Sequence, residues 1–367
     1  MLSRQFGILT LSLTWAASSA LADGSLGNYF TYSGFGTAGL AHSDTSNAEW
    51  VQSTQTAGSS DNFDYKTDSK LAVQGTVTPA QWISGTGQLL TEQRYGPEFT
   101  TKFEWAFIKV TPLPGLSIRG GELELPTFLV SDTRNVGYAN TWLRAPDEVY
   151  GAAIFDTFNG YDITYRHAVG PYTLSVNGLA GAMASSVSLI SPHSTREASL
   201  HGHDTRGYNA TLDMGDVSVR VGRVTTGIAA ELGTLILARS TYTFDSVGAT
   251  YDNSKLLIQS EFIERRTHSP VYNANGMYLL GGYHLGKWMP YGIYGAGQEV
   301  GGNNGLVPSV SKHSIGAGVR LDWFQNIDFK AQVDHVTGSV NGDPFFTTQP
   351  GFDSSANVFS LAVDFVF

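Results

Sequence analysis

The segment from Asn357 to Phe367 constrains the fold more than any other part of this chain. Large apolar side chains stand at every second position, namely Phe359, Leu361, Val363, Phe365 and Phe367. Because successive side chains of a β-strand point to opposite faces, the segment predicts a strand with one apolar and one mixed face. A strand that closes a membrane-embedded barrel places such an apolar face against lipid. The alternative is the final strand of a soluble sandwich, where such an edge would promote aggregation.

The first residues resemble an export signal. Arg4 precedes an apolar run from Phe6 to Trp15, and Ala20-Leu21-Ala22 supplies a small-x-small cleavage site. We therefore expect residues 1–22 to be a cleaved signal peptide and residues 23–367 to be the barrel domain. The apolar run is too short to remain as a membrane helix. Export followed by barrel formation predicts the cell outer membrane of a Gram-negative bacterium as the location.

The composition limits the classes of function. The formal net charge is −10, from 32 acidic and 22 basic residues, which argues against a nucleic-acid partner. The chain has no cysteine, so thiol catalysis and cysteine-based metal sites are excluded. The mean hydropathy is −0.10. A membrane protein this polar is expected to be a β-barrel, because half of each strand faces water or the lumen.

Short turns and long polar stretches alternate along the chain. Seven tight connections carry Gly, Pro, Asn or Asp, and eight longer stretches lie between them, which predicts sixteen strands. The long stretches lie near 43–60, 94–100, 126–157, 187–204, 226–238, 268–274, 300–309 and 338–354. The predicted fold class is therefore all-β, a transmembrane antiparallel barrel of about 16 strands. At this strand number the lumen stays open to water.

Individual strands show which residues are expected to face the lumen. In Lys102–Ile108, the aromatic residues Phe103, Trp105 and Phe107 alternate with Lys102, Glu104 and Ala106. The pattern predicts that the aromatic row faces lipid and that the charged row faces a hydrated interior.

Residues 126–157 are unusual for a loop, because many of them are large and apolar. These are Phe128, Leu129, Val130, Val136, Tyr138, Trp142, Leu143, Val149, Tyr150, Ile154 and Phe155. A loop this apolar needs a wall against which it can pack. Folding into a wide barrel would supply that wall and narrow the lumen.

Four segments resemble the trimeric sixteen-stranded porins of Gram-negative outer membranes, in their divergent proteobacterial branch. They are Ser33–Gly39 (SGFGTAG), Gly121–Ala139 (with GELELP, FLVSD and VGYA), Trp142–Tyr150 (WLRAPDEVY) and the last strand, which ends in Phe. The overall pattern covers the whole mature chain. The resemblance implies a homotrimer in contact with outer-membrane lipid, through which small hydrophilic solutes and ions pass.

In that family the third long loop folds inward and forms the constriction, with acidic loop residues opposite basic wall residues. The resemblance implies that the acidic side consists of Asp132, Asp147 and Glu148. The wall candidates, chosen by alternation and position, are Lys102, Arg119, Arg166, Arg220 and Arg320.

The chain departs from the family pattern at Glu122 and Glu124, where basic residues are expected. These two carboxylates either line the wall and favour cations, or hold backbone or arginine partners. Arg134 and Arg144 likewise either line the constriction or tie the loop to the wall through salt bridges. Both alternatives stay open at the level of sequence.

Several other patterns are discounted. Gly34–Gly39 matches G-x-G-x-x-G, but no helix is predicted after it, so the glycines are expected to serve close packing or bending. His193, His201 and His203 share one predicted outer loop without an evident third ligand. No Gly-x-Ser-x-Gly motif marks a nucleophile. We therefore expect no catalytic residues, no cofactor and no metal.

The sequence thus predicts a passive channel for small hydrophilic solutes and ions rather than an enzyme. Two alternatives remain: a substrate-selective outer-membrane channel, and a closed barrel that serves as a surface receptor or adhesion scaffold.

Overall fold

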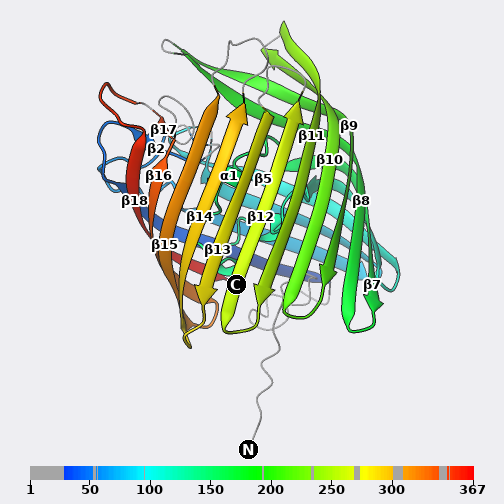
Figure 1. Cartoon of the computed structure of the whole chain (residues 1–367). Helices are drawn as coiled ribbons and strands as arrows, with labels where there is room; N and C mark the ends of the chain where they lie inside the picture. The colour runs from blue at the N-terminus through cyan, green and yellow to red at the C-terminus, as the bar shows by residue number, and fades with distance from the viewer. Residues whose placement is uncertain are drawn as a thin grey trace, which may run out of the picture.

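The computed structural model describes residues 29–52, 55, 57–94, 96–191, 194–232, 235–267, 273–300, 309–338, 345–346 and 348–367. The expected signal peptide, residues 1–22, lies outside the described residues. Within the described ranges, sixteen strands close into one antiparallel barrel (Figure 1), which confirms the fold class and the strand number predicted from the turns.

Each barrel strand pairs with the next one along the chain, and β18 pairs with β1 to close the ring. The barrel strands are β1 (Phe30–Ser43), β3 (Lys70–Ala80), β4 (Ile83–Gln93), β5 (Phe99–Leu113), β6 (Leu116–Glu124), β7 (Thr157–Val169), β8 (Tyr172–Ser191), β9 (Ser194–Asp213), β10 (Val217–Leu232), β11 (Leu235–Asp252), β12 (Leu256–Thr267), β13 (Asn273–Tyr283), β14 (Trp288–Val300), β15 (Val310–Phe324), β16 (Ile327–Thr337) and β18 (Ser355–Val366). A separate small sheet pairs β2 (Glu49–Trp50) with β17 (Phe345–Phe346).

The closing strand β18 has the predicted alternation. Phe359 and Leu361 are 50% and 57% exposed on the outer face, whereas Ser360 and Asp364 are buried on the inner face. The last residue takes part in the closure, because the backbone N–H and C=O groups of Phe367 both bond to the backbone of Gly34.

The glycines of the discounted G-x-G-x-x-G pattern have a packing role in this closure. A Cβ atom on Gly34 would overlap the ring of Phe367, and one on Gly36 would overlap the ring of Phe365. The two phenyl rings therefore lie flat over β1 only because these positions carry no side chain.

Four neighbouring strands, β8 to β11, are the longest of the barrel, with 16 to 20 residues. β8 and β9 have 20 residues each, whereas β6 has 9. The long loops expected at 187–204 and 226–238 are wrong, since pairing continues to Ser191↔Ser194 and Leu232↔Leu235. The polar residues of these segments are typical of a loop. The paired strands nevertheless extend beyond the rim formed by their neighbours (Figure 1), because strand pairing supplies the hydrogen bonds that their backbone groups need.

Strand β5 contains a bulge that reverses the predicted faces. Phe103 pairs with Leu89 and Trp105 with Gln88, so Glu104 is an extra residue opposite β4. Beyond this point Phe107 is buried inside, contrary to the prediction that it faces lipid. One extra residue moves every later side chain of a strand to the other face.

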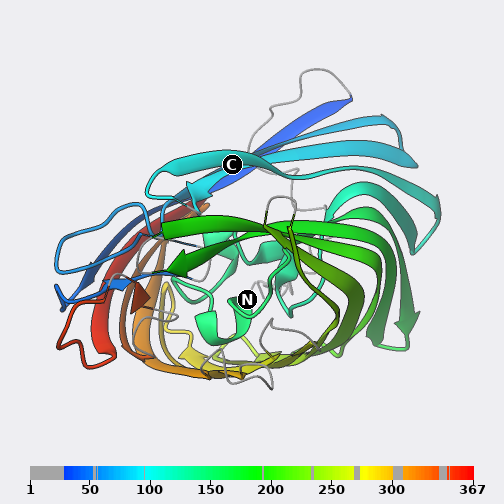
Figure 2. The ribbon, with the colours of Figure 1, turned by 90° about the horizontal axis from the view of Figure 1, so that it is seen from above.

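Residues 126–157, called the inner loop below, fold into the lumen (Figure 2). They contain three single-turn helices, η2 (Ser131–Thr133), η3 (Gly137–Ala139) and α1 (Asp147–Tyr150). None of the helices in the described part of the chain has the length and apolarity needed to cross a membrane.

The apolar side of the inner loop packs on the wall formed by β11 to β14. The ring of Trp142 meets the ring of Tyr278 edge-on, with 5.5 Å between the ring centroids. The ring of Phe155 meets the ring of Tyr242 edge-on, with 5.9 Å between the centroids. The other buried members of this contact include Phe128, Tyr150, Phe244, Ile263, Leu280 and Ile293. Burying each large side chain contributes roughly 1.5–3 kcal/mol, so this contact is a main source of the loop's stability.

Candidate pore constriction

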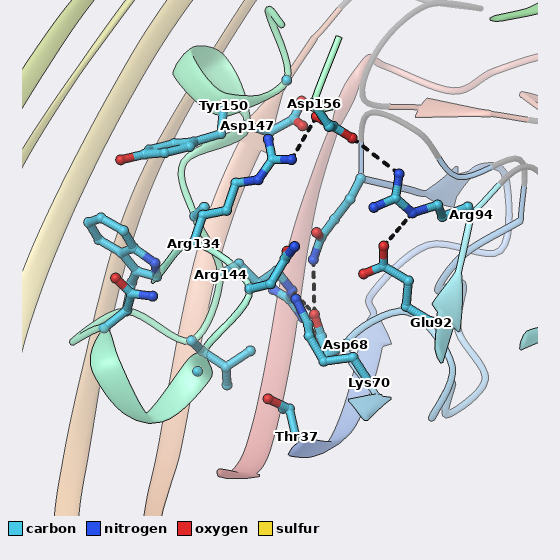
Figure 3. A pocket seen from close by; sticks show the side chains of 18 of the residues that line it. Thr37, Asp68, Lys70, Glu92, Arg94, Arg134, Arg144, Asp147, Tyr150 and Asp156 are labelled. Carbon is cyan, nitrogen blue, oxygen red and sulfur yellow. Dashed lines mark hydrogen bonds and ion pairs between the residues drawn. The ribbon is translucent and has the colours of Figure 1, made fainter. Parts of the chain in front are cut away.

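One ionic network ties both ends of the inner loop to the wall. Arg134 lies between Glu124, at the end of β6, and Asp156, with Nη2 2.8 Å from Asp156 Oδ1. Arg94 approaches the other oxygen of Asp156 at 3.1 Å and also contacts Glu92 (Figure 3). Burial alone would raise the pKa of the Asp156 carboxyl, but Arg134 and Arg94 hold that pKa well below its usual range. Asp156 therefore stays charged between the two arginines.

Arg144 ties the middle of the inner loop to two distant parts of the chain. It donates through Nε and Nη2 to the two oxygens of Asp68, at 2.6 Å each, and lies 3.4 Å from Asp334 on β16. Its guanidinium also covers the ring of Trp50 at 4.3 Å. Arg144 is only 7% exposed, so its charge is used inside the protein.

Two wall cations hold the backbone of the inner loop. Lys330 donates to the carbonyls of Gly137 and Trp142 at 2.7 and 3.1 Å. Arg320 donates to two carbonyls between these positions, at 2.8 and 2.9 Å. A Cβ atom at Gly137 would overlap the carboxylate of Asp364, so only glycine allows the loop to approach the wall this closely.

The helix α1 is anchored on the neighbouring part of the same wall, formed by β13, β14 and β15. Asp147 accepts from Lys312 of β15 at 2.5 Å. Glu148 is 4% exposed, and its burial raises the pKa of its carboxyl. It lies over positions of β13 and β14 where any side chain would collide with it, namely Gly276, Gly295 and Gly297. Both carboxylates are thus held at the wall.

A cavity of about 440 Å³ lies between the inner loop and the short turns of the barrel. The exposed carboxylate of Asp132 projects from the loop into it. Arg119, Arg166 and Arg220 line it from the wall, so four predicted residues share one compartment. Lys109, which the alternation did not predict, lines the same cavity because the bulge in β5 turns it inward.

The cations on this side have few partners. Lys109 lies directly opposite Arg119 in the register of β5 and β6, so like charges are adjacent. Arg119 donates through Nε to Asp162 at 3.0 Å. In the part of the chain that the structure describes, neither Lys109 nor Arg166 has a carboxylate at ion-pair distance.

A second, smaller cavity of about 120 Å³ lies on the long-loop side (Figure 3). It is lined by the ionic groups that anchor the loop, among them Arg94, Arg134, Arg144 and Asp156. Asn140 borders both cavities, so the segment around it separates the two compartments.

The remaining wall candidates have different positions. Lys102 lies 2.7 Å from Glu104, on the inner face near the long loops. Glu122 stands opposite Ala106 and Asn159, whose side chains are exposed on the outer face. Glu122 therefore does not line the lumen, contrary to its predicted place in the pore wall, because β6 keeps its alternation past Gly121.

Sequence reasoning missed several residues that hold the loop or line the cavity, namely Asp68, Lys109, Lys312 and Lys330. Lys330 could have been found, because it alternates with apolar residues along one strand. Asp68 precedes β3 in a polar stretch and carries no signal that links it to Arg144.

The histidines do not form a metal site among the described residues. His201 and His203 lie on β9 rather than in an outer loop, and His203 Nδ1 is 3.1 Å from Asp204. The side chain of His193 lies outside the described residues. No group of three or more histidine and acidic side chains in the described ranges could hold a metal ion.

A closed barrel of sixteen strands with its third long loop folded inward is the architecture of porin-like outer-membrane barrels. Three of the solved structures that are similar to this chain in fold are the following. OmpT of Vibrio cholerae in its trimer form is 14% identical, with a TM-score of 0.59 over 92% of this chain and 99% of that chain. OmpF of Salmonella typhi in complex with daunomycin is 14% identical, with a TM-score of 0.56 over 92% and 97%. The anion-selective porin from Comamonas acidovorans is 12% identical, with a TM-score of 0.54 over 92% and 99%.

No protein-family model matches the chain, and no curated protein matches its sequence. At identities this low the likeness concerns the fold alone. What the protein does has to be argued from its own lumen.

Proposed function

We propose that this protein is an outer-membrane channel through which small hydrophilic solutes and ions diffuse passively. The observation that carries the proposal is the cavity of about 440 Å³, lined by charged and polar side chains, in the lumen of a sixteen-stranded barrel. Barrels of this size enclose an aqueous lumen, because their diameter grows with strand number. The inner loop narrows that lumen. Passive diffusion through it would need neither a cofactor nor an energy source.

The field across the cavity would set the ion selectivity. Asp132 projects from the loop, and the wall carries the cations Lys109, Arg119, Arg166 and Arg220 together with the carboxylates Asp213, Asp216 and Asp252. Pore width and such opposed charges are the usual determinants of permeation. On this proposal, the four wall cations favour anions, and Asp132 together with the three wall carboxylates moderates that preference.

The other residues first considered for the constriction act as anchors in this proposal. Asp147 and Glu148 lie against the wall, and Arg134 and Arg144 hold carboxylates away from the turn-side cavity. They would influence permeation by fixing the position of the loop rather than by meeting solutes.

The proposal includes export through the signal peptide 1–22 and assembly as a homotrimer in outer-membrane lipid. Two observations support it. The outer face is apolar at positions such as Phe359 and Leu361. The Vibrio cholerae OmpT that shares the fold was solved in a trimer form.

Reconstitution of the purified protein in planar lipid bilayers tests the proposal. Stepwise ion conductance, together with a reversal potential on the anion side under a salt gradient, is the expected result. The same preparation after heat denaturation serves as the control.

The outcomes separate the alternatives. Conductance that saturates with one solute would indicate a substrate-selective channel. A folded barrel without any conductance would contradict the channel proposal and favour a closed receptor or adhesion scaffold.

A further inference from the structure

On the outer face of β10 to β13, a row of apolar side chains lies next to a row of charged ones. Val221, Val247, Phe262 and Met277 lie side by side in the register of these strands. They are 45%, 45%, 46% and 42% exposed, and they point away from the lumen. In a barrel that spans a membrane, such a row contacts the acyl chains of lipid.

The next row toward the long loops is charged. Arg223 of β10 donates through Nε and Nη2 to the two oxygens of Asp245 of β11, at 2.5 and 3.0 Å. Arg266 of β12 contacts the same carboxylate and lies 3.4 Å from Glu264. The side chains of Arg223 and Arg266 nevertheless remain 46% and 47% exposed, so their outer N–H groups are available.

A third arginine completes the group. Arg206 of β9 lies opposite Thr225, which lies opposite Thr243, which lies opposite Arg266. The row spans three strand spacings, roughly 14 Å. Arg206 is exposed and has no carboxylate at ion-pair distance within the described residues. Three arginines thus flank two threonines, Thr225 and Thr243, on the outer face.

We propose that Arg206, Arg223 and Arg266 bind the phosphate group of a lipid headgroup in the leaflet on the long-loop side. Guanidinium groups match phosphate oxygens with paired N–H donors, and threonine hydroxyls add further donors. The apolar row directly below holds the acyl chains of the same lipid. The proposal rests on the membrane location of the barrel and not on its conductance.

The charge balance favours an anion over a purely structural ion-pair group. The arginines outnumber the two carboxylates, Asp245 and Glu264, although the whole chain is acidic with a net charge of −10. Exposed ion pairs contribute only about 0–1 kcal/mol. Stability therefore gives little reason to place Arg206, which has no carboxylate at ion-pair distance among the described residues, diagonally across from Arg223. Asp245 instead holds two guanidinium groups side by side, ready for a shared ligand.

The test measures binding of phosphatidic acid to the full chain in non-ionic detergent micelles, with diacylglycerol as the same lipid without its phosphate. Native mass spectrometry counts the bound lipids. The triple variant Arg206→Gln, Arg223→Gln, Arg266→Gln should lose affinity at least about tenfold, since each of several charge-assisted bonds is removed. Lys255→Gln, which removes an exposed cation beside a short turn, should bind as the native protein does.

Single substitution of Arg206 keeps the test decisive if the triple variant folds poorly, because Arg206 anchors no carboxylate among the described residues. Arg206→Gln should weaken binding about threefold and leave thermal unfolding unchanged. Its conductance in bilayers should match that of the native channel, which separates this proposal from the proposed function.

Four results would overturn the proposal. They are unchanged binding by the triple variant, an equal loss in Lys255→Gln, equal binding of diacylglycerol, and inorganic phosphate bound as tightly as the lipid. Binding that disappears with a chelator would also overturn it, because Asp245 and Glu264 would then hold a divalent cation between protein and lipid.

Discussion

Two like-charge pairs lie on the inner wall, in different surroundings. Arg320 stands directly opposite Lys330 on β15 and β16, and Lys109 stands directly opposite Arg119 on β5 and β6. The first pair donates to four carbonyls of the inner loop and contacts two buried carboxylates. Among the described residues, the second pair has one carboxylate at ion-pair distance, Asp162, and it faces a cavity. In both places two adjacent like charges repel each other. The pair Arg320–Lys330 is surrounded by acceptors and anchors the inner loop, whereas the pair Lys109–Arg119 has few acceptors and faces the lumen.

The variant Lys330→Met should show the largest effect. The Lys330 side chain has no exposed surface and lies 2.9 Å from Asp364, which is also buried. Its loss leaves a buried carboxylate without its cation, so the free energy of unfolding should fall by about 3 kcal/mol. Urea titration of tryptophan fluorescence in lipid vesicles measures this change.

The matched control is Lys109→Met on the other wall. This substitution removes repulsion from Arg119 and should change the free energy of unfolding by less than about 1 kcal/mol, in the stabilising direction. Equal losses in the two variants would contradict the distinction between Arg320–Lys330, the anchoring pair, and Lys109–Arg119, the open pair.

The anchoring of the inner loop is tested in a second way by comparing the stability of Asp156→Asn with that of the native protein as the pH is lowered. A carboxyl whose pKa is lowered by folding contributes stability above its unfolded pKa of about 3.9, and that stability is lost as the pH falls through the folded pKa. Since Arg134 and Arg94 lower the pKa of Asp156, the variant should be less stable than the native protein by about 2 kcal/mol near neutral pH.

The difference between Asp156→Asn and the native protein should stay constant above pH of about 5 and shrink below about 4. Asp132→Asn, which removes an exposed carboxylate of the same loop, is the control for the loss of a negative charge. A pH-independent loss in Asp156→Asn would mean that its packing, and not its ion pairs, holds the loop.

The barrel itself was predictable because its signals are local and repeated. Alternation like that of β18 and turn residues between strands recur along the chain, so their sum identifies a closed barrel. The inward loop was predicted from the apolar residues of 126–157 and from the family resemblance. The faces of β5 were not predictable, since the extra residue Glu104 leaves no mark in the sequence. This single bulge is the reason that Lys109 was missed and Phe107 was assigned to lipid.

The candidate site was predictable in part for a related reason. Alternation and resemblance selected Asp132, Arg119, Arg166 and Arg220, which line one cavity, although their effect on permeation stays a prediction. The partners of the loop were not accessible. Asp68 and Arg144 are separated by 76 positions along the chain, and their contact depends on the packed loop rather than on any local pattern.

The smallest expected effect is on ion selectivity, and it concerns the open pair. At a separation of ~10 Å in water one unit charge changes the energy of a passing ion by ~0.4 kcal/mol, which is about a twofold change in permeability ratio. Lys109→Gln should therefore shift the reversal potential toward cations by that amount, and Asp132→Asn should shift it toward anions. Lys255→Gln, outside the cavity, should leave the reversal potential unchanged.

Measuring the reversal potential at several salt concentrations separates an effect of the electric field from an effect of the pore width. Screening shortens the range of these charges from about 10 Å at 0.1 M to about 3 Å at 1 M, so the shift caused by Lys109→Gln should shrink in concentrated salt. A shift that persists at high salt would indicate that the substitution changed the width of the pore. No shift at low salt would mean that Lys109 leaves the field in the cavity unchanged and has no role in selectivity.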